Sequence, residues 1–295
     1  MKISPALHSA VTIMTPLLFA ATGGLFSELA GMLNIALEGL LLAGAFAAVA
    51  AAYFTGSISS ALIFAVLASV SLSALLAFTT LKLRSNMFIA GLAANLLAGG
   101  LTIVLSQHLF GTRGVVVLRD TSHLNIIDIP LVKSIPVIGG LLSGHSAYVY
   151  ASWLLLFASW IAIYKTPFGY RLRACDKHST ALVSIGIRPD SYRWAALLVS
   201  GFCCGIGGAF LSLNLGAFVP NMTAGKGWIA LVVIFLGGRR PLGLLAAAFV
   251  FGLADAFSNY AQGLPFVPAD FILAMPYLLT FAAMVFVSIL AKKKN

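Results

Sequence analysis

Six long runs without a charged residue most restrict what this chain can fold into. They cover residues 3–27, 39–81, 85–112, 134–164, 194–225 and 271–291. Each run is at least the roughly 20 residues that a helix needs to cross a bilayer, and the second is long enough for two helices. Membrane strands would instead alternate apolar and polar positions. The sequence therefore predicts an all-α fold, a polytopic transmembrane helix bundle.

Composition supports a membrane protein. Hydrophobic residues make up 60% of the 295-residue chain and charged residues only 9%, against about 25% charged residues in soluble domains. The net charge of +10 does not indicate a nucleic-acid partner, because the basic residues lie in short connections between spans. The three cysteines, Cys175, Cys203 and Cys204, lack the spacing of a metal site.

The apolar runs predict a single transmembrane domain over residues 1–295 with about 8–10 membrane segments. The expected spans are 8–27, 33–53, 58–81, 87–106, 147–164, 194–215, 227–238, 242–258 and 271–290. The segment 227–238 is too short to cross alone, which indicates a short, broken or re-entrant helix. Basic residues at 82–84, 165–193, 239–240 and 292–294 place these connections and the C-terminus in the cytoplasm, and the N-terminus outside.

The connection 165–193 is the one predicted cytoplasmic loop long enough to fold by itself. Pro167 can open a short helix, Asp176 can cap a second one, and Gly186 fits the position just after its end. Apolar and basic side chains alternate around Phe168 and Arg171. Two interpretations stay open from the residues alone: a docking element for a cytoplasmic protein, or a basic loop that only obeys the positive-inside rule.

Four segments together resemble a known family. They are SELAGMLNIALEGLLLAGAF from Ser27, TPFGYRLRACDKHSTALVSIGI from Thr166, SGFCCGIGGAF from Ser200, and GKGWIALVVIFLGGRRPLGLLAAAFVFGLADA from Gly225. In this order they resemble the integral membrane permease of ABC importers, in the branch that includes ribose, nucleoside and branched-chain amino-acid systems.

The first segment distinguishes the members of this branch. Sugar permeases typically carry Asp-Leu-Ser-x-Gly there, and branched-chain amino-acid permeases carry Asn-x-Ala-His-Gly. Asn34-Ile-Ala-Leu-Glu38-Gly39 instead resembles the Asn-Ile-x-x-Glu-Gly of nucleoside-type permeases, and the chain has the length of their shorter subunit. The resemblance thus implies nucleoside transport, with ribose or a branched-chain amino acid as the alternative cargo.

The resemblance also implies partners. The 165–193 loop would hold the coupling helices that contact a cytoplasmic ATPase, through Phe168, Gly169, Arg171, Arg173, Ala174 and Gly186. A second, unlike permease subunit and an extracytoplasmic substrate-binding lipoprotein would complete a transporter of the cytoplasmic (inner) membrane. Cys175-Asp176-Lys177-His178 and Gly238-Arg239-Arg240 depart from the family pattern, which affects the docking contacts more than the fold.

Glu28, Glu38, Asp255 and Asp270 are carboxylates within or beside apolar segments, where a charge costs about 2.5–3.5 kcal/mol. Asn34 can cap the second span, and the helix N-terminus then favours Glu38 one turn later. A structural role for Glu38 and a role in the substrate path therefore both remain open. Side chains with hydrogen-bonding groups or aromatic faces form the predicted translocation path: Asn34, Glu38, Asn86, Phe88, Asn95, Asn214 and Phe218.

Two other functional classes have less support. The chain has no Gly-x-x-x-x-Gly-Lys-Ser/Thr motif, so ATP would be hydrolysed by the partner and no cofactor is expected on this chain. An ion-coupled secondary transporter would show carboxylates in corresponding positions of two repeats, and no such repeat is evident. The five histidines are scattered without a matching set of carboxylates, so the chain is not predicted to be an enzyme.

Overall fold

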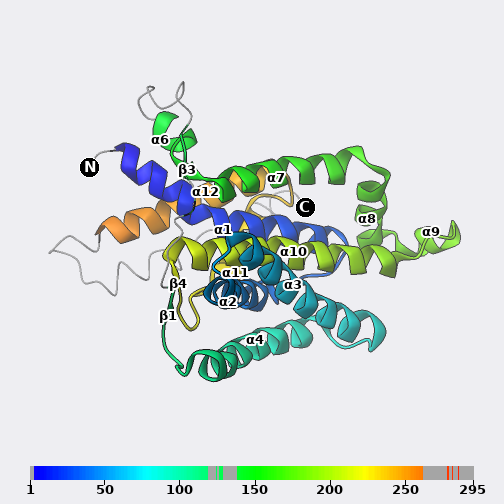
Figure 1. Ribbon diagram of the computed structural model, residues 1–295. Coiled ribbons are helices and arrows are strands. Elements are labelled where there is room, and N and C mark those ends of the chain that lie inside the picture. Colours follow the sequence, from blue (N-terminus) through cyan, green and yellow to red (C-terminus); the bar gives the residue numbers. More distant parts are fainter. Residues whose placement is uncertain are drawn as a thin grey trace.

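The computed structural model describes residues 3–118, 124, 126–128, 138–261, 278, 281 and 285, and shows a bundle of helices (Figure 1). Within these residues, 7 helices are long and apolar enough to cross a membrane. The predicted all-α membrane bundle is therefore confirmed. The predicted last span, 271–290, and the candidate carboxylate Asp270 lie outside the described residues, apart from the helical positions 278, 281 and 285.

The first half of the chain forms four long helices. These are α1 (Ile3–Leu29), α2 (Leu37–Thr55), α3 (Ile58–Ala77) with the π-helical continuation η1 (Phe78–Lys82), and α4 (Met87–Phe110). Left-handed glycines, Gly56 and Gly111, end α2 and α4, as is common at helix C-termini. The second span begins at Leu37 instead of the predicted residue 33, with Ala36 as its N-cap.

The second half contains long and short helices. They are α6 (Ile138–Leu142), α7 (Ala147–Lys165), α8 (Pro167–Lys177), α9 (Ser179–Ser184), α10 (Pro189–Leu215), α11 (Lys226–Leu236) and α12 (Pro241–Ala261). With 11 residues, α11 is about 16 Å long, roughly half the hydrocarbon thickness. The predicted short segment is thus confirmed.

Four two-residue strands form two small antiparallel pairs. β1 (Val116–Val117) pairs with β4 (Ala217–Phe218), with Val116 opposite Phe218. β2 (Ile126–Ile127) pairs with β3 (His145–Ser146). Both pairs lie at the end of the bundle that holds the start of α1, whereas α8 and α9 project from the opposite end (Figure 1). We call these the strand end and the α8 end.

Close packing of α10 against its neighbours depends on small residues. Modelling a Cβ on Gly201 would bring it within 2.7 Å of the Ser73 Cβ in α3, and one on Gly205 within 2.7 Å of the Val66 Cα. A Cβ on Gly208 would lie 2.2 Å from the Leu41 carbonyl oxygen in α2. These small residues of α10 therefore permit its close approach to α2 and α3.

Candidate functional site

The 165–193 loop folds into α8 and α9, as its sequence indicates. Thr166 caps α8 by accepting a hydrogen bond from the Gly169 amide at 3.2 Å, and Pro167 occupies the first turn. Gly169 must be small, because an added Cβ would lie 2.2 Å from the Ile163 carbonyl oxygen at the end of α7. The turn from α7 into α8 is therefore tight.

In this loop the predicted role of Asp176 is wrong and the predicted role of Gly186 is confirmed. Asp176 lies in the last turn of α8 and does not cap α9, whose N-cap is His178 without a side-chain hydrogen bond. The loop between the helices is too short to leave Asp176 outside α8. Gly186 follows α9 with a left-handed φ of 77°, as predicted for a residue just after a helix end.

The predicted coupling residues lie on different faces of α8 and α9. Gly169 is buried, while Phe168 packs on Tyr192 with 5.5 Å between the ring centroids. Arg173 lies over the Tyr164 and Tyr170 rings at 4.9 and 5.0 Å. Arg171 is exposed, Ala174 is half-buried, and Gly186 is exposed. Exposed apolar side chains also project here: Tyr170, Val183 and Ile185.

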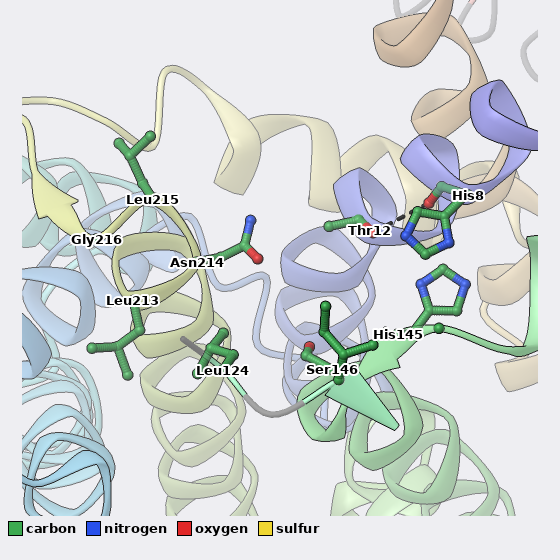
Figure 2. A pocket seen from close by; sticks show the side chains of 11 residues that line it. His8, Thr12, Leu124, His145, Ser146, Leu213, Asn214, Leu215 and Gly216 are labelled. Atoms are coloured by element: carbon green, nitrogen blue, oxygen red, sulfur yellow. Dashed lines mark hydrogen bonds between the residues drawn. The ribbon is translucent and has the colours of Figure 1, made fainter. Parts of the chain in front are cut away.

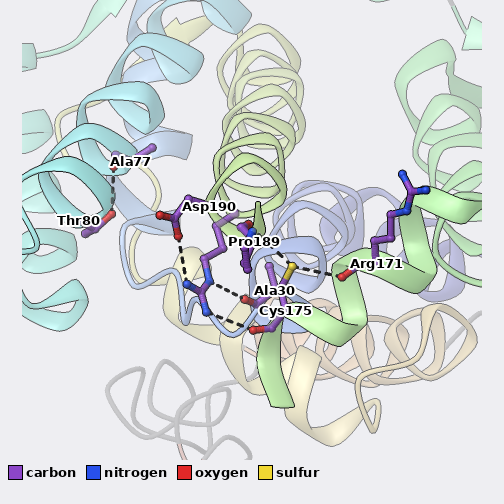
Figure 3. Close-up of polar contacts among 8 residues, drawn as sticks. Ala30, Ala77, Thr80, Arg171, Cys175, Pro189 and Asp190 are labelled. Carbon is purple, nitrogen blue, oxygen red and sulfur yellow. Dashed lines mark hydrogen bonds and ion pairs between the residues drawn. The ribbon is translucent and has the colours of Figure 1, made fainter. Parts of the chain in front are cut away.

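Arg193 connects α8 to the transmembrane helices, and Figure 3 labels its three partners, Ala30, Cys175 and Asp190. Its guanidinium donates to the Cys175 carbonyl of α8 at 3.1 Å and to the Ala30 carbonyl after α1 at 3.4 Å, and it pairs with Asp190 at 3.2 Å. The sequence indicated only a positive charge at this position. The i,i+3 spacing to Asp190 is a visible signal, but the two carbonyl partners come from distant segments.

A second connection joins the same region to the α11–α12 turn. Glu28, near the end of α1 and buried, forms a 2.6 Å ion pair with the Arg239 guanidinium. Gly31 follows with a φ of 77°, and an added Cβ would lie 3.1 Å from the Asp176 Cα of α8. The end of α1 thus contacts both α8 and the turn that contains Arg239.

The segment between α1 and α2 is held by Asn34. Its side-chain amide nitrogen donates to the Ser200 hydroxyl of α10 at 2.8 Å, and its side-chain oxygen accepts from the Ala36 amide at 3.0 Å. Asn34 precedes α2 by three positions, so it orders the approach to the helix and is not its N-cap.

Glu38 accepts hydrogen bonds from another helix through both of its carboxylate oxygens. One carboxylate oxygen accepts from the Gly225 amide at 2.8 Å and the other accepts from the Gly227 amide at 2.6 Å. These amides lie at the start of α11 and have no acceptor within that helix, and a carboxylate at this place is favoured by the helix dipole. A Cβ on Gly227 would lie 2.3 Å from the Glu38 backbone nitrogen. Glu38 therefore joins the first turn of α2 to the first turn of the short helix α11.

Asn95 of α4 attaches to the same place. Its side-chain oxygen accepts from the Gly39 amide at 2.7 Å, and its side-chain nitrogen donates to the Ile35 carbonyl at 3.0 Å. An added Cβ on Gly39 would lie 2.9 Å from the Asn95 Cα. Three predicted path residues, Asn34, Glu38 and Asn95, thus converge on the start of α2 and connect it to α10, α11 and α4.

The other predicted path residues lie elsewhere. Asn86 caps α4 by accepting from the Phe88 amide at 2.9 Å, and the Phe88 ring is exposed. Phe218 is fully buried against Phe46, with 5.1 Å between ring centroids, so a path along it requires that this cluster opens. Asn214, exposed near the end of α10, lines two cavities at the strand end.

No group of three or more His, Cys, Asp or Glu side chains that could hold a metal occurs among the described residues. Cys175, Cys203 and Cys204 are free and buried. Burial raises the pKa of the Cys175 thiol, which makes it a poor nucleophile.

The chain was then compared with known proteins. Residues 6–288 match the family described as the permease component of the branched-chain amino acid transport system. The chain belongs to this family. The nucleoside ABC transporter permease NupC of Lactococcus lactis is 32% identical over 282 residues, 90% of this chain and 86% of NupC. The guanosine ABC transporter permease NupQ of Bacillus subtilis is 33% identical over 282 residues, 91% of this chain and 87% of NupQ.

A solved ABC transporter in an inward-facing conformation has the same fold. Its TM-score is 0.56 at 16% sequence identity, over 95% of this chain and 85% of that chain. The family therefore agrees with the resemblance seen in the sequence. The protein is a multi-pass permease subunit of an ABC importer of the cytoplasmic (inner) membrane, and is not itself an enzyme. As such it works with an ATPase subunit and a substrate-binding protein.

Proposed function

We propose that this permease carries nucleosides into the cell. The observation that carries the proposal is the identity of 32% and 33% to two permeases named for nucleoside and guanosine transport. The motif from Asn34 to Gly39 supports the same cargo, because Asn34, Glu38 and Gly39 together match the nucleoside-type pattern and not the sugar or amino-acid patterns. A separate ATPase subunit supplies the energy. The permease alternates between a state open to the outside and a state open to the cytoplasm.

The arrangement of the subunit in the membrane is part of this proposal. The α8 end faces the cytoplasm, because it holds Lys165, Arg171 and Arg193. The strand end, with the start of α1, then faces outside and receives the substrate-binding lipoprotein. The C-terminus lies inside. A second, unlike permease subunit completes the pore.

For the translocation path we propose two roles. Asn34, Glu38 and Asn95 fix the start of α2, and thereby the shape of the path, through their bonds to α10, α11 and α4. Asn214 faces the cargo directly, because its side chain lines cavities and forms no hydrogen bond with another described residue. Asn86, Phe88 and Phe218 flank the path at its two ends.

Uptake by cells tests the cargo. The permease is co-expressed with its partner permease, ATPase and binding protein, and uptake of labelled uridine, adenosine, ribose and leucine is measured. We expect uptake of the nucleosides to exceed that of ribose and leucine, and to stop with a catalytically inactive ATPase. Uptake of ribose or leucine alone would contradict the cargo. Nucleoside uptake that persists with the inactive ATPase would indicate an ion-coupled transporter instead.

The exposed apolar side chains of α9 and of its C-cap residue are expected to contact the ATPase. Val183 is 62% exposed and Ile185 is 69% exposed, beside the predicted coupling residues of α8. Changing both to aspartate should weaken ATPase binding by about 100-fold, because burying an aliphatic side chain contributes about 1.5–3 kcal/mol and about 1.4 kcal/mol is tenfold. Pull-down of the ATPase with the solubilised permease measures this.

Thr180→Asp is the matched control for charge. Thr180 is also exposed on α9, and an aspartate in the first turn of a helix is favourable. This variant should retain the ATPase. If both variants retain it equally, α9 is not a docking surface. If both lose it, the added charge explains the loss and the apolar contact does not.

A further inference from the structure

A mixed polar and apolar cavity of about 500 Å³ lies between α1, α10, α11 and α12. This volume is within the range of small-molecule sites. Ile13, Phe210 and Ile229 form apolar parts of its wall. Two hydroxyl side chains also line it, Thr12 and Ser258, together with four amide or charged side chains from three helices: Asn214, Lys226, Asp255 and Asn259.

Two residues of opposite charge, Lys226 and Asp255, lie in the wall of this cavity. Lys226 begins α11, roughly half the hydrocarbon thickness from the α8 end, and Asp255 lies in the second half of α12. Neither side chain forms an ion pair or a hydrogen bond with another residue that the structure describes. Ionisable groups inside a membrane that face a cavity typically mark a substrate pathway.

The wall chemistry selects a neutral ligand. Lys226 and Asp255 cancel in charge, so an ion gains little from entering. Lys226 offers only donors, Asp255 only acceptors, and the amides of Asn214 and Asn259 offer both. A ligand that fits has hydroxyl groups that donate to the Asp255 carboxylate. It also has carbonyl or ring-nitrogen atoms that accept hydrogen bonds, and a flat apolar face that packs on the Phe210 side of the wall.

A second cavity of about 370 Å³ lies beside this one at the strand end. Thr12 and Asn214 line both cavities, and Figure 2 shows their side chains directed into the same space between α1 and α10. On its far wall His8 stacks on His145, with 4.1 Å between ring centroids. Burial and the neighbouring His8 lower the pKa of His145, so the His145 ring is uncharged at pH 7.

We propose that the cavity between α1, α10, α11 and α12 binds a nucleoside, with Asp255 and Lys226 contacting its ribose hydroxyls and Phe210 beside its base. The inference rests on the proposed function, and adds the place and the residues of binding. Asp255 accepts hydrogen bonds from the ribose diol. Asn214 and Asn259 contact the remaining polar edges, and the second cavity is the entrance from the strand end.

Protection of a cysteine tests the site without measuring transport. Asn214→Cys is introduced into the full chain, assembled with its partners, and treated from outside with a water-soluble methanethiosulfonate reagent. The native cysteines are buried and give little background. We expect saturating uridine or adenosine to slow the labelling about tenfold, and the corresponding 2′,3′-dideoxynucleosides to protect much less. Ser57→Cys, exposed in the α2–α3 connection, should react equally with and without ligand.

Asp255→Asn in the Asn214→Cys chain should abolish the protection. If Asp255→Asn impairs folding, Asn259→Ala replaces it as the variant. If Asn214→Cys impairs folding, Thr12→Cys replaces it as the reporter. Nucleoside uptake by the complex without protection of either reporter overturns the cavity proposal and leaves the proposed function intact. A complex that imports no nucleoside overturns both. Reporters that never react show that the cavity is closed from outside, which also contradicts the proposal.

Discussion

Replacing Glu38 with alanine is expected to separate α11 from α2 and to abolish transport. The change leaves the Gly225 and Gly227 amides without the acceptors that the carboxylate provides at 2.8 and 2.6 Å. An unsatisfied buried polar group costs about 1–3 kcal/mol, and the dipole interaction of the carboxylate with α11 adds about 0.3–1 kcal/mol. Proteins are stable by about 5–15 kcal/mol, so the loss is large.

Thermal unfolding of the purified permease measures this effect together with nucleoside uptake. Glu38→Gln should be intermediate, because its one carbonyl oxygen can accept from one of the two amides. Gly227→Ala should behave like Glu38→Ala, since the added Cβ would lie 2.3 Å from the Glu38 nitrogen. Gly99→Ala is its control, because no atom lies within 4 Å of the added Cβ on α4.

The result separates the two roles that the sequence left open for Glu38. A purely structural role lowers the unfolding temperature and uptake together. If Glu38→Ala lost uptake while its unfolding temperature stayed at the wild-type value, the carboxylate would act on the cargo and the connection to α11 would be dispensable. Equal uptake and stability in all four variants would contradict both roles.

Sequence predicted the spans well because their signal is local. A helix that crosses lipid must be apolar over its own length, and the runs that contain α1, α3, α4 and α7 show this directly. The short α11 could also be predicted, since Arg239 and Arg240 end its apolar run after too few residues for a crossing. The turn of α7 into α8 followed from Pro167.

The contacts of the polar residues could not be predicted in the same way. Asn34 has the residue type and position of a helix cap, but its amide bonds to Ser200 of α10, and α2 starts later. Glu38 was expected near a helix start, and the structure adds that the amides it satisfies belong to another helix. Partners this far apart along the chain are brought together by helix packing, which no local pattern records.

Arg193→Ala is expected to reduce nucleoside uptake by about tenfold or more while the complex keeps its ATPase activity. Arg193 bonds to α8 through Cys175 and to the residue after α1, Ala30, so we expect it to transmit movement of α8 to the segment that leads into α2. Cutting a hydrogen bond to a charged group costs about 1.5–3 kcal/mol, and about 1.4 kcal/mol is a factor of ten. Uptake and ATP hydrolysis are measured on the same reconstituted complex.

Two further variants distinguish transmission of movement from stability. Arg193→Lys should recover little uptake, because an ammonium group lacks the planar fork that reaches two carbonyls and Asp190 at once. Arg240→Ala removes an exposed arginine at the same end of the bundle and should leave uptake unchanged. If Arg193→Ala lost uptake only in proportion to the amount of assembled complex, Arg193 would support the fold alone. If uptake is lost while ATP hydrolysis per complex is retained, Arg193 acts between the ATPase contact and the start of α2. There Asn34 and Glu38 bond to α10 and to the start of α11.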